Sequence, residues 1–232
     1  MTRTMQLHVA DGRAHRAAIE TIFRSTMAGG SPMPFFLDGI DDYTRFCLEW
    51  YFTAAGGHTI AVLDGERVVG YALVATDPAA YERHLKRAFA SLVVRVSLRL
   101  MSGRLNAPSR RFFRDRARDS WLIWQDRHRI DVADEAHAHM NVAADVRHGT
   151  VAAELRAAID RTVAASGHVS WIGEVNGDFG RRRRALERIV GDVLDERPNI
   201  TASRMLGHRV VRYTVRRPLT RSREFTAPES ES

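Results

Sequence analysis

The chain has 232 residues, of which 44% are hydrophobic and 27% are charged, a balance that is ordinary for a globular protein with a full core. A single cysteine, Cys47, excludes an internal disulfide framework, and no apolar run approaches the roughly 18 residues that span a bilayer. We therefore expect a soluble, cytoplasmic protein without a membrane span.

The net charge of +7 is concentrated in one segment of the chain. Residues 82–119 hold eleven Lys and Arg against three Asp and Glu, so the rest of the chain is close to neutral. This distribution favours a local anionic contact over a general coating of nucleic acid, and we expect no nucleic-acid partner. The alternative is an adaptor that binds nucleic acid or an acidic partner through 82–119, with an affinity that falls steeply with salt.

The amino-terminal part of the chain predicts a strand, two helices and a hairpin. Apolar residues recur at helical spacing before Gly29-Gly30, and Asp64-Gly65 is a strong signal for a tight turn between two strands. In chain order we expect a strand over 6–10, helices over 13–27 and from Asp41 to Gly56, and strands over 58–63 and 67–76.

Residues 78–132 form an insertion that predicts helices. Leu85, Phe89, Leu92 and Val96 line one side of a helix, and an aromatic-rich piece follows it. We expect a helical excursion that packs on the domain or closes a homodimer. A lid over the substrate and a helix lying on a membrane surface are the alternatives.

The carboxyl-terminal part begins with the stretch from His137 to Ala152, which holds the clearest functional signal. A predicted strand over 137–143 ends in a short loop with Arg147 and Gly149, and a helix over 150–165 begins inside that loop. The first N–H groups of a helix point at one spot, where the helix dipole is positive, so such a loop can bind a pyrophosphate. We expect a strand over 169–176, a helix over 181–194, strands over 200–205 and 209–216, and a disordered tail over 219–232.

The loop and the order of elements resemble the GNAT superfamily of acyl-CoA-dependent N-acetyltransferases. In that family a strand ending in valine leads, five residues later, to an Arg/Gln-x-x-Gly-x-Gly/Ala loop; here Val142 precedes Arg147 by five residues and Ala152 takes the last small position. The resemblance implies an α/β (α+β) fold with a mixed central sheet flanked by helices. It implies a single domain over 1–218, with the insertion between the third and fourth strands.

The resemblance also implies an activity and a set of binding residues. The expected function is transfer of an acetyl group from acetyl-CoA to an amine of a small molecule or peptide. The residues carried over for acetyl-CoA are Met140 and Val142 beside the thioester, Arg147, His148, Gly149, Thr150, Val151 and Ala152 around the diphosphate, and Asn176 near the pantetheine.

Two departures from the family pattern keep other functions open. Thr150 stands where the family usually has glycine, and the tyrosine that often protonates the thiolate is missing from the segment after Asn176. The alternative is a catalytically degenerate GNAT-fold protein that binds CoA or a metabolite. A longer acyl donor is a further possibility.

Three residues are candidates for proton transfer. His137 and His139 lie on the same face of their predicted strand, and a histidine with an ordinary pKa of about 6.5 can act as a general base. Glu174 lies among apolar residues, where a carboxylate is costly unless it is paired or has a task. Hydrogen-bonded strand histidines and an ion pair with an arginine are the structural alternatives. Glu135, His137 and His139 form a possible metal pattern, but no second cluster adds ligands, so we expect no metal.

The loop over 31–36 carries three large apolar side chains, Met33, Phe35 and Phe36. It falls where GNAT proteins shape the pocket for the amine. We expect these side chains to bind an acceptor with a hydrophobic surface.

Overall fold

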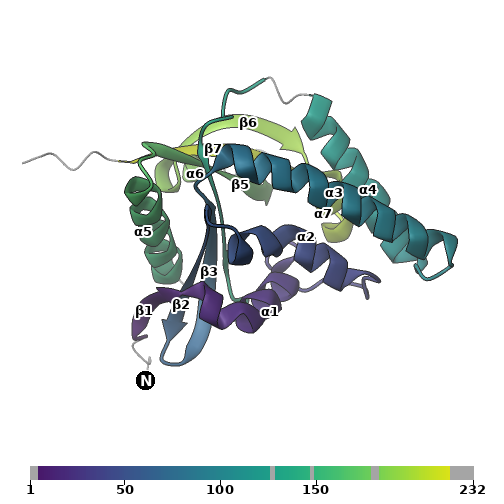
Figure 1. Ribbon diagram of the computed structural model, residues 1–232, viewed down its shortest axis with the longest axis horizontal. Helices are drawn as coiled ribbons and strands as arrows, with labels where there is room; N and C mark the ends of the chain where they lie inside the picture. Colours follow the sequence, from purple (N-terminus) through teal and green to yellow (C-terminus); the bar gives the residue numbers. More distant parts are fainter. Residues whose placement is uncertain (1–4, 126–128, 147–148, 179–182, 220–232) are drawn as a thin grey trace, which may run out of the picture.

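The computed structural model describes residues 5–125, 129–146, 149–178 and 183–219. Its centre is a seven-stranded sheet with the order β1-β2-β3-β4-β5-β7-β6 (Figure 1). Neighbouring strands are antiparallel except β4 and β5, which are parallel. The strands are β1 (Leu7–Asp11), β2 (Gly57–Asp64), β3 (Arg67–Ala75), β4 (Ala136–Val142), β5 (Ser170–Asp178), β6 (Asp192–Pro198) and β7 (Val210–Pro218).

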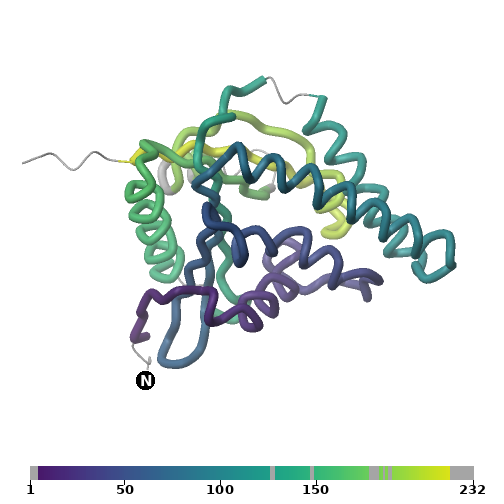
Figure 2. The backbone as a smooth tube through the Cα atoms, in the orientation of Figure 1, coloured from purple at the N-terminus to yellow at the C-terminus, as the bar shows by residue number. Residues whose placement is uncertain are grey.

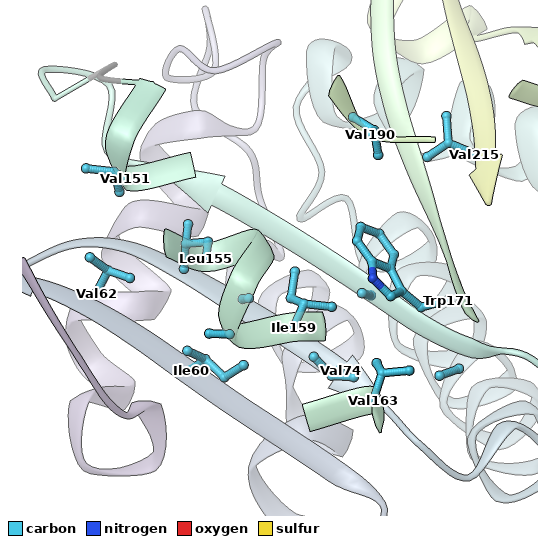
Figure 3. Close-up of a cluster of buried hydrophobic side chains, with 14 of the residues drawn as sticks. Ile60, Val62, Val74, Val151, Leu155, Ile159, Val163, Trp171, Val190 and Val215 are labelled. Carbon is cyan, nitrogen blue, oxygen red and sulfur yellow. The ribbon is translucent and has the colours of Figure 1, made fainter. Parts of the chain in front are cut away.

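The two faces of the sheet are covered by different helices (Figure 1). One face is packed by α5 (Gly149–Ala165), and the other by α1 (Arg16–Thr26), which follows a short 3-10 helix (Gly12–His15), and α2 (Ile40–Thr53). The side chains buried between α5 and the sheet include Ile60, Val62, Val74, Val151, Leu155, Ile159 and Trp171 (Figure 3). On the opposite face, which we call the helical face, the core includes Ile19, Leu48, Tyr51, Tyr71 and Leu73.

The insertion lies between the third and fourth strands, as the sequence predicts, and forms two helices. These are α3 (Pro78–Met101) and α4 (Ala107–Gln125), which extend as an arm beyond the sheet (Figure 2). Asp77 caps the start of α3, because its side chain accepts a hydrogen bond from the N–H of Ala80. It packs on α2, where Arg95 and Arg99 bind Asp42 at 3.1 and 2.9 Å.

Helix α4 is joined to the carboxyl-terminal part of the chain by buried carboxylates. Asp119 accepts hydrogen bonds from the N–H groups of Ile200 and Thr201 at 2.9 and 3.0 Å, and from the Thr201 hydroxyl at 2.6 Å. These groups begin α7 (Ile200–Leu206), so a side chain of the insertion caps a helix that lies about 80 residues later in the chain.

The carboxyl-terminal prediction was wrong in two places. The helix predicted over 181–194 is only α6 (Arg183–Ile189), after which Asp192–Pro198 forms β6, paired with β7. The strand predicted over 200–205 is helix α7. Asn199 decides this boundary, because its side-chain oxygen accepts the N–H of Ala202 at 2.9 Å and caps the helix.

The remaining predicted elements are found within one to four residues of the expected bounds. Within the described ranges, none of the helices combines the length and the apolar character that a bilayer crossing requires. The tail prediction for 219–232 falls outside the described residues from 220 onwards.

Replacing Asp119 with alanine tests the link between the insertion and α7. We expect Asp119→Ala to lower the free energy of unfolding by about 3 kcal/mol, because two helix N–H groups and a buried hydroxyl lose a charged acceptor. Urea denaturation measures this change. As a control, Asp134→Ala at an exposed position should stay within about 0.5 kcal/mol of the wild type; equal stability of the two variants would contradict the role of Asp119.

Candidate active site

The sheet opens between β4 and β5. Their parallel pairing covers only Ala136–Ala138 and Trp171–Gly173. Beyond this point β4 continues to pair with β3 as far as Val142, and β5 continues to pair with β7 as far as Asp178. Each strand follows its antiparallel neighbour, so the two central strands part. We call the region beyond Ala138 and Gly173 the β4/β5 opening.

Backbone groups of β4 point into this opening. The N–H of Ala143 donates to the carbonyl of Val69 on β3 at 2.9 Å. Alternate residues of an antiparallel strand direct their N–H and C=O groups to opposite sides, so those of Met140 and Val142 point away from β3 and towards β5. Among the described residues, no ladder with β5 uses them. They are therefore available to a bound molecule.

The amino-terminal end of α5 follows β4 at the same end of the opening. Gly149 and Thr150 are exposed, and a Cβ built on Gly149 would have no heavy atom within 4 Å. Val151 is fully buried and contacts Gly70 on the sheet, so its side chain anchors the helix and only its N–H is a candidate for binding an anion. Ala152 is half-buried. The predicted Arg147 and His148 lie outside the described residues.

His137 and two tyrosines form a chain of contacts on the helical face. The hydroxyl of Tyr51 from α2 is 3.4 Å from Nδ1 of His137 and 3.0 Å from the hydroxyl of Tyr81 from α3. The ring of Tyr81 stacks on that of His137, with centroids 5.6 Å apart and 16° between the planes. The insertion thus contributes directly to the surroundings of a predicted catalytic residue.

His139 lies two residues along the same face, next to Asn141. The amide nitrogen of Asn141 is 3.2 Å from Nε2 of His139 and donates to the Tyr71 hydroxyl at 2.9 Å. Burial lowers the pKa of His139 to about 4, with the neighbouring His137 adding to the effect, and burial also lowers the pKa of His137. Both imidazoles are therefore neutral at pH 7.

Glu174 lies on β5 immediately beyond the last residue paired with β4. Its side chain is 44% exposed, and its Oε2 is 3.5 Å from Nε of Arg212 on β7. Its negative charge opposes the lowering of the pKa of both histidines, which places the carboxylate in their neighbourhood. The structure therefore brings Glu174, His137 and His139 together, and it also contains the arginine ion pair of the structural alternative. We call these three residues, with Tyr51 and Tyr81, the polar cluster.

Two other predicted residues have structural partners. Asn176 is exposed on the same face as Glu174, and its side-chain oxygen accepts a hydrogen bond from Asn199 at 2.8 Å. Glu135 binds Arg216 and accepts a hydrogen bond from Ser170 at 2.7 Å, so its carboxylate is paired with these two residues and not with the histidines. In the part of the chain that the structure describes, no group of His, Cys, Asp and Glu side chains is arranged to hold a metal ion.

The loop with Met33, Phe35 and Phe36 lies apart from the polar cluster. Met33 and Phe35 are half-buried, and Phe36 is 76% exposed. Phe35 packs near Phe112, at 6.5 Å between ring centroids, and lines a cavity of about 300 Å³ between this loop, α4 and α7. A second cavity, of about 320 Å³, lies between β1, β2 and α5. Neither cavity is lined by a residue of the polar cluster.

The structure adds residues that the sequence interpretation did not select. Tyr51 is buried in the core, but its hydroxyl reaches His137. Tyr81 belongs to the insertion, whose position over the sheet is not visible in the sequence. Arg116 is hidden among the basic residues of 82–119; its spacing of four from the buried Phe112 was the available signal that it faces inward.

Comparisons with known proteins identify the fold. No protein-family model matches the sequence, and no relative is found among curated proteins. Solved structures do match. SsHAT has a TM-score of 0.58 and 19% identity, covering 93% of this chain and 99% of that one. The GNAT superfamily phosphinothricin acetyltransferase of Sinorhizobium meliloti, in complex with acetyl-CoA, has a TM-score of 0.52 and 16% identity, covering 97% and 98%.

The protein yncA of Salmonella typhimurium, with its cofactor acetyl-CoA, has a TM-score of 0.52 and 12% identity, covering 99% of this chain and all of that one. At such identities the likeness establishes the fold. The chain has the fold of the GNAT N-acetyltransferases, and the mixed sheet flanked by helices that was expected from the sequence is confirmed.

The pKa of His139 predicts a loss of stability in acid. The unfolded chain binds the proton with a pKa near 6.5 and the folded chain only near 4, so the free energy of unfolding falls as the pH is lowered between these values. This one group should contribute a loss of about 3 kcal/mol, which His139→Gln removes and the exposed control His8→Gln retains. Denaturation at pH 7 and pH 4 with an NMR titration measures it; a His139 pKa near 6.5 would contradict the prediction.

Proposed function

We propose that this chain, which has the GNAT fold, is an N-acetyltransferase that moves the acetyl group of acetyl-CoA to an amine of a small molecule or peptide. The observation that carries the proposal is the β4/β5 opening. Met140 and Val142 direct backbone N–H groups into it, and the exposed start of α5 lies at its end. The acetyl-CoA in two neighbours with this fold supports the choice of donor.

The donor would lie along β4 with its diphosphate at the start of α5. The N–H groups of Gly149, Thr150, Val151 and Ala152, at the positive end of a 17-residue helix, would bind the diphosphate together with Arg147 and His148. Thr150, which stands where the family usually has glycine, is exposed at this helix start. Asn176, across the opening on β5, would bind the pantetheine arm.

The reaction we propose is direct attack on the thioester. The amine nitrogen adds to the carbonyl carbon, and the N–H groups in the opening stabilise the negative oxygen of the tetrahedral intermediate. The C–S bond then breaks, CoA leaves as the thiolate, and the proton of the amine goes to Glu174 directly or through water. Glu174 suits this role better than the neutral His137 and His139, because its negative charge also attracts a protonated amine.

A covalent acetyl-enzyme does not fit the residues that lie nearby. Burial raises the pKa of the Cys47 thiol to about 11, so almost none of it is thiolate at neutral pH. The raised pKa of Tyr81, about 12, likewise keeps this hydroxyl protonated, so it serves as a hydrogen-bond donor.

Met33 and Phe35 would belong to the outer wall of the acceptor site.

An aspartate at the start of α5 tests the binding of acetyl-CoA. Because the space around Gly149 is open, Gly149→Asp should fold normally while its charge repels the diphosphate, and we expect the Kd for acetyl-CoA to rise at least about 10-fold. Gly149→Ser is the neutral control and should bind like the wild type. Calorimetry measures both; equal affinities for the aspartate and serine variants would exclude the diphosphate from this position.

Glu174→Gln tests the proton acceptor. We expect kcat for amine acetylation to fall by about 100-fold or more, because the amide cannot take the proton, with acetyl-CoA affinity unchanged. The control is Glu66→Gln in the exposed turn between β2 and β3. Release of free thiol across a panel of amines is the readout. Acetyl-CoA binding without turnover of any amine by the wild type would favour a GNAT-fold sensor of CoA over an enzyme.

A further inference from the structure

Arg116 on α4 is a charged residue on the helical face that the proposed chemistry does not use. Phe112 and Asp119, which share its side of the helix, are only 4% and 3% exposed, so Arg116 faces inward and is itself half-buried. Its guanidinium carbon lies over the ring of Tyr43, 5.9 Å from the centroid. Within the described residues, it forms no hydrogen bond or ion pair.

Nearby carboxylates are already used by other groups. Both oxygens of Asp119 accept hydrogen bonds from the start of α7, and Asp115 pairs with Arg204 at 2.7 Å. Arg212 lies beside Glu174 at 3.5 Å. Arg95 and Arg99, on the neighbouring helix, share the carboxylate of Asp42. The charges of Asp119 and Glu174 act on Arg116, but among the described residues neither carboxylate hydrogen-bonds to it, so its guanidinium can bind a further anion directly.

The surroundings of Arg116 suit a bound anion. Burial raises the pKa of Tyr43, and its hydroxyl is hydrogen-bonded to Cys47, so the phenol stays neutral and supplies no negative charge to Arg116. The aromatic rings of Phe112 and Phe113 stand 5.3 and 6.4 Å from the Tyr43 ring, so one side of the guanidinium has apolar surroundings, where charge interactions are stronger than in water. The charge of Glu174 also acts on Arg116, which places the cation in the same interior as the polar cluster.

We propose that Arg116 binds a carboxylate of the acceptor, so that the substrate is an amino acid or a similar compound with both an amine and a carboxylate. The inference rests on the proposed function. The amine would face Glu174 and the β4/β5 opening, and the carboxylate would face α4. A guanidinium binds a carboxylate through two parallel hydrogen bonds, which fixes the direction in which such an acceptor lies.

The test compares the standard amino acids with their carboxamides as acceptors of acetyl-CoA. For the wild type we expect kcat/KM to be about 100-fold higher for the acid than for its amide. Arg116→Gln should bring this ratio close to one, mainly through KM, and Arg116→Lys should restore part of it. Arg114→Gln, at an exposed position on the same helix, is the matched control and should keep the full ratio.

Other outcomes overturn the inference. Equal use of acids and amides by the wild type does so, as does an equal loss for both kinds of acceptor in Arg116→Gln. Thermal unfolding with each amino acid gives a reading that does not require turnover. Stabilisation of the wild type that Arg116→Gln loses supports the carboxylate site even if nothing is acetylated, in which case only the proposed reaction fails. If no amino acid stabilises the wild type and none is acetylated by it, the inference is overturned.

Discussion

The parting of β4 and β5 is the constraint on which the rest of the structure depends. Each of these central strands has an antiparallel neighbour over nearly its full length and a parallel partner over only three residues. Antiparallel pairing keeps each strand with its outer neighbour, so the middle of the sheet opens without breaking either ladder. As a result, the backbone N–H groups of Met140 and Val142 point into the β4/β5 opening, and the apolar core under α5 packs one side of this region.

The two faces of the sheet serve different purposes around this opening. On the α5 side, Val151, Leu155 and Ile159 bury the helix in the apolar core, which fixes the position of its first turn relative to β4 (Figure 3). On the helical face, the same strands carry His137, His139 and Glu174. Strand alternation therefore separates an apolar support on one face of the sheet from a polar surface on the other.

Much of this arrangement follows from the sequence, and the misses have specific physical causes. The period of two in β4 predicts which side chains share a face, and the helix start at Gly149 follows from the loop pattern. The boundary at Asn199 was missed because a cap depends on one side-chain hydrogen bond rather than on hydrophobic spacing. The contacts of Tyr51 and Tyr81 with His137 join residues far apart in the chain, and no local pattern encodes them.

The insertion is attached to the domain through Asp42 on α2, through Asp38 in the loop before α2, and through the amino-terminal end of α7. None of these bonds involves β4 or the start of α5, and Tyr81 meets β4 only through side chains, by stacking on His137. Exchange of α3 and α4 for other helices would therefore alter the side chains next to the polar cluster and leave the backbone of the central strands untouched. Such a division gives evolution, or a protein engineer, a replaceable module for changing the side chains around the opening while its backbone groups stay constant.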